Sequence, residues 1–470
     1  MHKALKDLKQ KKSRDPNMYA NEIFQPQVAG KDLIKAILKL MNRIKNDSVY
    51  PKALTLCNIT SIYKHKGSHN IFSSYRGIFR VQALRNILER LLYNKEYSNI
   101  DSNLTDANVG ARQKRNIRDN IFVLNAVMNE TIQGTKEPVD ITVYEVEKCF
   151  DALWVQECIN DMYKARLQNN KLNILYLMNQ HAEVVIKTSS GNTTRTSMSN
   201  LIMQGTVWGS LFCTVSMDKL PMHQYENREN LYKYRGVVSV PSLEMVDDII
   251  DIKKCGKDSV ISNAVINSFI EHKKLTMGKS KCHKIHCGQK SEFCQDLKVH
   301  DNTMHNSNEE TYLGDQITAN GKHASTIAKR RARGYGIISD ILLVLEKIYN
   351  SERRIRVGLE LRQAWFVNSM LLNVEAWHNM LQKDMNIITS MDKYLVRKII
   401  NSHSKAPVEL LYLETGTVPV EYILASRRLN YFHTIITRNN NELTKQIYTQ
   451  QKENPVKGDR YYYIIDSKYG

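Results

Sequence analysis

The spacing of apolar residues predicts helices near the start of the chain and through its last third. Residues 31–47 carry apolar side chains at helical spacing, with Lys and Arg on the opposite face. Further helices are predicted at residues 80–98, at 117–130, from about 152 and near 171–181. From about residue 322 the helical pattern returns and continues for most of the remaining length.

Other segments have the pattern of strands. Residues 54–64 predict a strand that runs into a basic turn. Residues 139–147 alternate, which places Ile141, Val143 and Glu145 on one face. A hairpin is expected around the turn at 189–192, and residues 242–253 predict two short strands that meet at an acidic tip. Mixed strands and helices before a helical last third indicate an α+β fold with an appended helical region.

The charge balance favours a polyanionic partner. The 470 residues include 67 Lys and Arg against 48 Asp and Glu, a net charge of +19, and 42% of them are hydrophobic. This hydrophobic content is ample for a packed core and excludes a mostly disordered chain. A positive surplus of this size favours nucleic acid, because each phosphate that is neutralised releases condensed counterions.

Neither membrane insertion nor secretion is indicated. No run reaches the roughly 18 apolar residues that a membrane helix needs. The N-terminal segment MHKALKDLKQKKSRDP lacks the apolar region of a signal peptide. Eight cysteines in 470 residues are too sparse for a disulfide scaffold, so we expect an intracellular protein of the nucleus or cytoplasm.

One group of residues has the ligand types of a zinc site, namely Cys282, His283, His286, Cys287 and Cys294. Their spacing matches no common zinc finger. The segment has instead the pattern of a strand beside a basic turn. We therefore expect a strand here and not a zinc finger.

The strongest local signal is the pair Asp247-Asp248 within the apolar run MVDDII. Two adjacent carboxylates in a strand-forming run repel each other, and a divalent metal ion is the usual compensation. Phosphoryl transfer uses two such ions about 3.5–4 Å apart, and Mg²⁺ is commonly held by a few carboxylates and the substrate phosphates. Taken alone, however, the pair would more often be an exposed acidic turn.

Other polar sites precede this pair in a suggestive order. Glu145 lies on a predicted strand, and Gln204-Gly205 open a segment in which glycines permit close backbone approach. Upstream, Lys64 and Arg76 supply cations on a turn and a strand, which suits a triphosphate. The order is therefore basic segment, acidic strand, Gln-Gly loop and paired aspartates.

With these motifs in order, the sequence resembles the reverse transcriptases of non-LTR (LINE-type) retrotransposons over nearly its whole length. The blocks that carry the resemblance are residues 59–91 (fingers), 108–124 (NVGARQKRNIRDNIFVL), 143–151 (VYEVEKCFD), 204–212 (QGTVWGSLF), 245–249 (MVDDI), 279–288 (KSKCHKIHCG), 310–314 (ETYLG) and 371–377 (LLNVEAW). Any one of these is weak, whereas eight in order are specific.

The resemblance implies a role for each matching residue. The metal ligands would be Glu145, Asp247 and Asp248; the nucleotide-binding residues Lys64, Arg76, Phe150, Gln204 and Gly205, with Phe150 excluding a ribose 2′-hydroxyl; the primer grip Tyr312, Leu313 and Gly314; and the nucleic-acid backbone contacts Arg330, Arg331 and Arg333. Lys281 would protonate the leaving pyrophosphate as a general acid, or be a solvated lysine of a basic strand. The basic runs at 329–333 and 353–356 would otherwise be solvated helix faces or a nuclear-import signal.

The resemblance also implies a right-hand polymerase with an antiparallel palm sheet. Its parts would be an N-terminal helical extension (1–50), fingers (51–138), palm (139–315, with a fingers-side insertion at about 152–200), a helical thumb (316–400) and a C-terminal helical tail (401–470). It would extend a DNA primer on an RNA template with deoxynucleoside triphosphates and two Mg²⁺ ions, with Mn²⁺ as a possible substitute. No membrane and no obligate protein partner are expected.

The chain departs from the family at the first catalytic acid, where Glu145 replaces aspartate. Mg²⁺ demands near-octahedral geometry, and a misplacement of about 1 Å can cost about a hundredfold in rate. Asp140 lies on the opposite strand face, and Asp151 matches a second acidic position that is not a metal ligand. Ala111, Met18 and a start at Met1 without a preceding endonuclease domain also suggest a degenerate copy.

Two other interpretations remain open. The chain could be a catalytically impaired nucleic-acid-binding remnant of such an element. A group II intron maturase or a telomerase relative is a third interpretation, which the segments at 204–212 and 371–377 disfavour.

Overall fold

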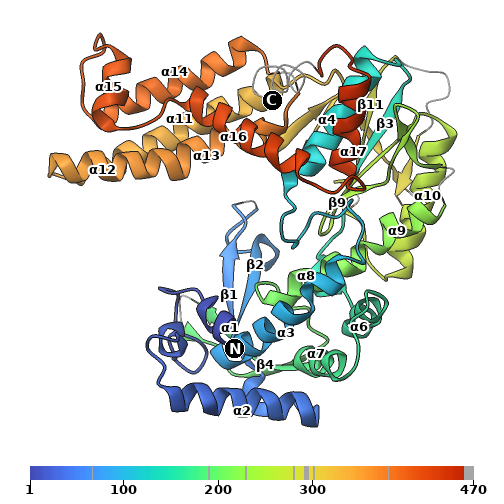
Figure 1. The fold of residues 1–470 in the computed structure, drawn as a ribbon, viewed down its shortest axis with the longest axis vertical. Helices are drawn as coiled ribbons and strands as arrows, with labels where there is room; N and C mark the ends of the chain where they lie inside the picture. Colours follow the sequence, from blue (N-terminus) through green and yellow to red (C-terminus); the bar gives the residue numbers. More distant parts are fainter. Residues whose placement is uncertain are drawn as a thin grey trace.

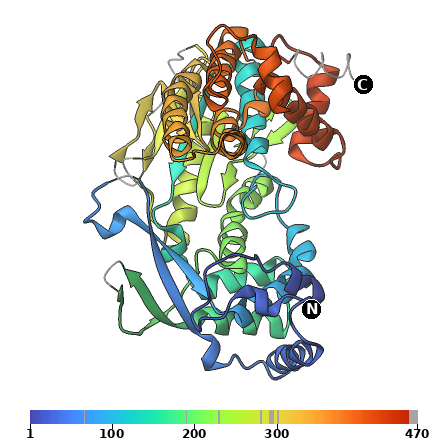
Figure 2. The same cartoon turned by 90° about the vertical axis from the view of Figure 1, so that its left-hand side faces the viewer.

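A computed structural model gives the fold and describes residues 1–65, 67–188, 191–227, 230–278, 281–289, 296–299, 302–378 and 380–459. Helices and strands are mixed along the chain, in agreement with the predicted mixture. The N-terminal part forms a lower lobe and the C-terminal helices an upper lobe in both views (Figures 1 and 2). No helix in these ranges is both long and apolar enough to cross a membrane.

The predicted helices are largely confirmed. Those of the described residues are α1 (His2–Lys6), α2 (Lys31–Asp47), α3 (Ala83–Asp101), α4 (Ile117–Gln133), α5 (Cys149–Ala152), α6 (Val155–Lys164), α7 (Asn170–Gln180), α8 (Val207–Met217), α9 (Lys219–Glu226), α10 (Lys257–His272), α11 (Ala324–Glu346), α12 (Ser351–Leu361), α13 (Asn368–Met370), α14 (Gln382–Ile399), α15 (Val408–Thr415), α16 (Val420–Ile436) and α17 (Leu443–Glu453). Helix α3 begins later than the predicted residue 80, because the preceding residues complete a strand.

The strands form two larger sheets and three small hairpins. They are β1 (Leu56–Tyr63), β2 (Tyr75–Val81), β3 (Val139–Glu145), β4 (His181–Thr188), β5 (Gly191–Asn192), β6 (Thr196–Ser199), β7 (Tyr232–Tyr234), β8 (Val238–Val240), β9 (Leu243–Met245), β10 (Asp248–Lys254), β11 (His283–Cys287), β12 (Lys298–Val299), β13 (Asn302–Thr303), β14 (His305–Ser307), β15 (Glu309–Tyr312) and β16 (Asp315–Thr318). The two strands predicted within 242–253 are therefore confirmed as β9 and β10. In the predicted hairpin turn at 189–192, the two serines lie outside the described residues.

The central sheet has the strand order β14-β11-β3-β10-β9. Neighbouring strands are antiparallel except for β14, which runs parallel to β11. The sheet is therefore mixed, whereas a purely antiparallel sheet was expected. A parallel neighbour needs a crossover of a dozen or more residues, and the long connection between β11 and β14 provides that length.

The two faces of the central sheet differ in polarity. On one face Val139, Ile141 and Ile250 pack in a large core with α4 and the C-terminal helices. The opposite face lies against α10, where Ser259 donates a hydrogen bond to Asp140 (2.8 Å). Glu145 has the same strand parity as the apolar residues and Asp140 the opposite parity, as predicted from the alternation.

In the lower lobe, β1 pairs with β2 in antiparallel and with β4 in parallel orientation. The β1–β2 hairpin extends from this lobe toward the upper one (Figure 1). A second core of buried side chains lies beneath it and includes α3, α6, α7 and α8.

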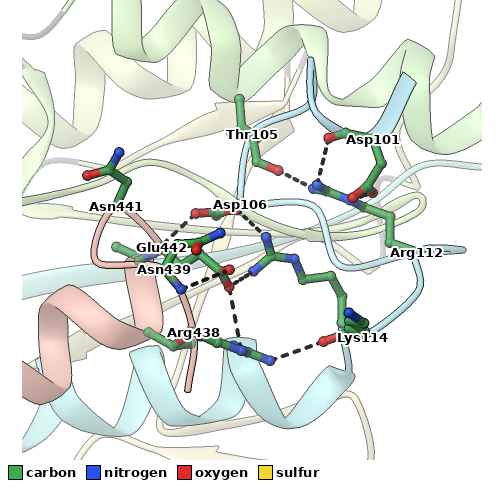
Figure 3. A network of polar contacts seen from close by, with 12 residues as sticks. Asp101, Thr105, Asp106, Arg112, Lys114, Arg438, Asn439, Asn441 and Glu442 are labelled. Carbon is green, nitrogen blue, oxygen red and sulfur yellow. Dashed lines mark hydrogen bonds and ion pairs between the residues drawn. The ribbon is translucent and has the colours of Figure 1, made fainter. Parts of the chain in front are cut away.

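The C-terminal segment is tied to the loop that follows α3 by a network of charged residues (Figure 3). Arg115 forms ion pairs with Asp106 (2.6 Å) and with Glu442 in the connection before α17. Arg438, just after α16, pairs with Asp119 of α4 (2.9 Å) and donates to the carbonyl of Lys114 (3.2 Å). These basic residues therefore hold two distant segments of the chain together.

Candidate active site

Two neighbouring strands in the interior of the central sheet bring three carboxylates to the same end of the sheet. Asp248 lies directly opposite Glu145 in the β3–β10 pair, and Asp247 is in the turn between β9 and β10. Directly opposite residues share a face and have Cβ atoms about 4.5–5.5 Å apart. The structure thus brings together the three acidic residues that the sequence motifs singled out.

An unusual backbone conformation presents the acidic pair. Val246 has a φ of 63°, which is an outlier for a β-branched residue. The side-chain oxygen of Asn108 accepts hydrogen bonds from the backbone N–H groups of Val246 (3.4 Å) and Gly110 (3.0 Å). A Cβ atom on Gly110 would lie 2.5 Å from the side chain of Val246, so only glycine fits there. The 108–111 loop therefore supports the turn.

A buried carboxyl group lies beneath the same turn. Glu244 of β9 is fully buried and accepts a hydrogen bond from the amide of Asn108 (2.7 Å). Burial raises the pKa of Glu244 well above its usual value. This shift favours the protonated form of Glu244, which limits the negative charge next to Asp247 and Asp248.

The pKa of each aspartate in this pair is raised. Desolvation is the largest cause for Asp248, followed by the negative charges of Asp247 and Glu145, and its pKa rises to about 6. Desolvation, followed by the charge of Glu145, also raises the pKa of Asp247. The cations Lys281 and Arg76 act in the opposite direction on both groups. The positive charge of a cation bound at this end of the sheet would therefore stabilise the ionised form of the two aspartates.

Lys281 already supplies part of that charge, because its ammonium forms an ion pair with Glu145. The backbone explains the contact: Gly278 donates to the carbonyl of Glu145 (2.9 Å), and Lys281 donates to the carbonyl of Gly278 (2.9 Å). Both side chains remain about two-fifths exposed (42% and 41%). The lysine is therefore fixed beside the first acidic residue and accessible from solvent.

Strand β2 and the Gln-Gly loop lie against each other. The carbonyl of Gln204 accepts a hydrogen bond from the backbone of Phe79 (2.9 Å). Gly205 has a φ of 102°, and a Cβ atom there would lie 2.9 Å from Ile78. Arg76 is exposed on the same strand and acts electrostatically on both aspartates. The loop with Gln204 and Gly205 thus packs against the strand that carries Arg76.

The other two predicted nucleotide-binding residues lie at the ends of elements. Lys64 is exposed just after β1, and its ammonium donates to the carbonyl of Ser73 (3.0 Å). Phe150 is half-buried on the short helix α5, which follows β3.

The predicted primer grip is the β15–β16 hairpin. Leu313 and Gly314 form its turn with φ values of 47° and 88°. Tyr312 is buried, and its hydroxyl group accepts a hydrogen bond from Asn120 (3.2 Å) and donates to the carbonyl of Leu243 (3.4 Å). The ring of Tyr312 therefore cannot touch a primer as expected. It joins the hairpin to β9 instead, and only Leu313 and Gly314 remain at the tip.

Arg330 was expected to face a nucleic-acid backbone, and this prediction is wrong. Its side chain is buried, pairs with Asp315, and donates to the carbonyl of Met370 (3.1 Å). The guanidinium lies over the ring of Trp377 at 4.9 Å, and that indole donates to Asp315 (2.9 Å). Arg330 thus anchors the β15–β16 hairpin to the helical region and is not available to phosphates.

The neighbouring basic residues are exposed. Arg331 and Arg333 both lie on the solvent side of α11. Arg331, Tyr335, Lys383 and Tyr394 line a groove of about 530 Å³ between α11 and α14. Basic and aromatic side chains in one groove suit a phosphate backbone with stacked bases.

The three carboxylates have the chemistry of Mg²⁺ ligands, but their oxygen atoms do not form a compact ligand cluster among the described residues, where Glu145 is paired with Lys281. They offer hard oxygen ligands at one end of the sheet, which Mg²⁺ prefers, and desolvation together with their mutual repulsion raises the pKa of both aspartates. Glu145, Asp247 and Asp248 would hold such ions, with Glu145 exchanging its contact with Lys281.

Three supporting residues were not singled out from the sequence. Asn108 and Gly110 lie within the recognised 108–124 block, and Asp315 directly follows the Tyr-Leu-Gly motif. The signal that could have identified Asn108 and Asp315 was the position of a polar residue next to a glycine-containing turn motif. Their partners, Val246 and Trp377, lie more than 60 positions away in the chain, so only the fold reveals the contacts.

No family model matches the chain, and no curated protein matches it. Among solved structures, apo telomerase from Candida tropicalis truncated from its C-terminal domain has a TM-score of 0.40 and 14% identity over 66% of this chain and 62% of that chain. Telomerase from Candida albicans in complex with a TWJ fragment of telomeric RNA has a TM-score of 0.41 and 13% identity, over 84% of this chain and 69% of that chain. Apo telomerase from Candida tropicalis has a TM-score of 0.43 and 12% identity, over 89% of this chain and 74% of that chain.

This chain spans less than two thirds of the first of these telomerase chains. With such low TM-scores and identities, the likeness assigns neither a family nor an activity to the chain.

Proposed function

We propose that the chain is the polymerase part of a non-LTR retrotransposon protein and copies RNA into DNA. The observation that carries the proposal is the register of β3 and β10, which sets Glu145 opposite Asp248 with Asp247 in the adjoining turn. Its support from sequence is the order of eight motifs around these residues. In this interpretation the lower lobe corresponds to fingers, the central sheet to the palm and α11–α14 to the thumb.

The residues of the chain divide the work of nucleotidyl transfer. Bound divalent ions would activate the primer 3′-hydroxyl and stabilise the leaving pyrophosphate. Arg76 and Lys64 would neutralise the incoming triphosphate, and Phe150 would exclude a ribose 2′-hydroxyl. Lys281 would move from Glu145 to the departing pyrophosphate and donate a proton to its oxygen.

A second candidate function is binding without turnover, and one observation favours it. Glu145, the residue that departs from the family, is held by Lys281. If that ion pair persists, the longer side chain cannot take its place at the metal ions. The chain would then bind an RNA–DNA hybrid but would not extend it.

Primer extension distinguishes the two candidates. A DNA primer annealed to an RNA template should gain deoxynucleotides in the presence of Mg²⁺, and ribonucleotides should be excluded. Products are resolved by length on a denaturing gel. If neither the chain nor Glu145→Asp extends the primer, while both bind it, the binding-only function is correct and the polymerase proposal fails.

The groove between α11 and α14 should contact the duplex backbone. Replacing Arg331 and Lys383 together with alanine is expected to weaken binding of an RNA–DNA hybrid at all sequences alike. The slope of log affinity against log salt should become shallower by about one unit for each phosphate that the groove no longer neutralises. Fluorescence anisotropy across a salt series measures both quantities.

Arg43→Ala is the matched control, because Arg43 is highly exposed on α2 (81%), in the opposite lobe. An unchanged affinity and slope in the double variant would show that the groove is ordinary surface.

A further inference from the structure

Three potential metal ligands meet at the end of the central sheet remote from the acidic turn. They are Asp140 near the start of β3, Cys255 just after β10 and His286 on β11, and their ligand atoms all lie within 4.8 Å of one another. The register of β3 and β11 accounts for part of this cluster, because it places Asp140 directly opposite His286. The backbone of Cys255 donates to the carbonyl of Pro138, just before β3 (3.1 Å).

The hydrogen bonds of His286 determine which ring nitrogen faces the cluster. Nε2 lies 3.0 Å from the carbonyl of Gln289, and a carbonyl can only accept, so Nε2 carries a proton. Nδ1 lies 3.1 Å from a carboxylate oxygen of Asp140. In a neutral imidazole that Nδ1 is a lone pair facing another acceptor. A proton, carried by the ring or by the carboxyl group, or a metal ion must therefore lie between them.

The remaining contacts match those of a metal-bound histidine. Such a histidine commonly donates its other N–H group to a backbone carbonyl, which fixes the ring and raises its basicity, and Gln289 supplies that carbonyl. The second oxygen of Asp140 accepts from Ser259 (2.8 Å), which orients the carboxylate. Asp140 is buried, whereas Cys255 and His286 are half-buried, so an ion could enter from solvent.

We propose that Asp140, Cys255 and His286 bind one zinc ion. Thiolate sulfur, imidazole nitrogen and carboxylate oxygen are the ligands that zinc prefers, and tetrahedral bonds of about 2.0–2.3 Å place ligand atoms roughly 3.3–3.8 Å apart. The fourth position would take water. Binding would release the thiol proton of Cys255 and any proton on Nδ1 to solvent.

Charge around the site is compatible with this ion. The ammonium of Lys284 lies 3.8 Å from the second oxygen of Asp140 and remains beside it, while thiolate and carboxylate neutralise the two charges of zinc. The ion would join β3, β10 and β11 at one end, and the acidic turn lies at the other end of the same strands. The zinc proposal is independent of polymerase activity.

Cobalt provides a direct test, because a cobalt–thiolate bond absorbs in the near ultraviolet. The purified full chain, stripped of metal and titrated with Co²⁺ in excess Mg²⁺, should develop this absorption and saturate at one ion per chain. Zn²⁺ should displace the cobalt and raise the melting temperature.

Cys255→Ser should abolish the thiolate absorption, and His286→Gln should weaken Co²⁺ binding by at least about 100-fold, the upper range for losing only an outer partner. His283→Gln is the control, because His283 lies on the same strand with its side chain on the opposite face, near Glu310 (3.4 Å). Circular dichroism verifies folding of each variant.

Absence of the thiolate band in the folded chain, or an equal band in Cys255→Ser, would overturn the zinc proposal. In that case His286 and Asp140 form a hydrogen-bonded pair without a metal ion.

Discussion

Replacing Glu145 with aspartate is expected to raise the rate of primer extension by roughly one to three orders of magnitude, a barrier change of about 1.4–4 kcal/mol. The shorter side chain would restore the metal-ligand geometry that Mg²⁺ requires. The shorter side chain would also extend less far toward Lys281, so the ion pair that now holds Glu145 would be weakened. Both effects act on the chemical step, so affinity for the RNA–DNA hybrid should barely change.

Single-turnover incorporation of one nucleotide measures this effect without interference from product release. Glu147→Asp is the matched control, since Glu147 undergoes the same shortening two positions away and is exposed. Mn²⁺ should partly rescue the unaltered chain, because it tolerates distorted oxygen sites better. A chain that is already active, with no gain from Glu145→Asp, would show that glutamate is a competent ligand.

Replacing Arg330 with methionine is expected to lower the free energy of unfolding by about 3–5 kcal/mol, since removing one partner leaves a buried charge uncompensated. Asp315 would be left buried beside the indole of Trp377, which still donates to it, but without its cationic partner. Burial already raises the pKa of Asp315 to about 6, against the opposing effect of Arg330. Urea unfolding followed by circular dichroism measures the loss.

Arg331→Met is the control for this experiment, because its side chain is exposed on the next position of α11. Its effect should stay within about 0.5 kcal/mol. Replacing Asp315 with leucine in the Arg330→Met background should recover part of the stability, because both charges are then absent. Equal effects of the two arginine replacements would contradict the buried role of Arg330.

Local patterns predicted the elements well where one face of an element is apolar. Residues 31–47 form α2 with those bounds, and the alternation of 139–147 placed Glu145 and Asp140 on opposite faces of β3. The acidic tip was predictable because two carboxylates interrupt an otherwise apolar strand pair. In each case the information lies within a few residues of the chain.

The burial of Arg330 could also have been predicted from periodicity. The buried positions of α11 include Ile327, Arg330, Gly334 and Ile338, at helical spacing. Arg330 therefore falls on the apolar stripe, whereas the basic run around it was interpreted as one solvated or phosphate-facing surface. Composition of a run is a weaker guide than the position of each residue on the helix.

Contacts between distant segments could not be predicted in this way. Lys281 meets Glu145 because the segment after α10 packs beside the end of β3. His286 was noticed among other cysteines and histidines of its own segment, but its partners Asp140 and Cys255 come from two other segments. The order of strands in the sheet decides such contacts, and the spacing of residues within one segment does not reveal that order.

The central claim is that Glu145, Asp247 and Asp248 form one nucleotidyl-transfer site, and single-nucleotide incorporation in Asp248→Asn tests it most directly. The variant keeps the shape of the side chain and removes one charge opposite Glu145. Asp151→Asn is the matched control, because Asp151 is exposed and close in sequence to Glu145. We expect Asp248→Asn to lose at least about 10³-fold in rate, or about 4 kcal/mol, with hybrid affinity retained and Asp151→Asn unaffected. Incorporation by Asp248→Asn at the rate of the unaltered chain would contradict the assignment of this site.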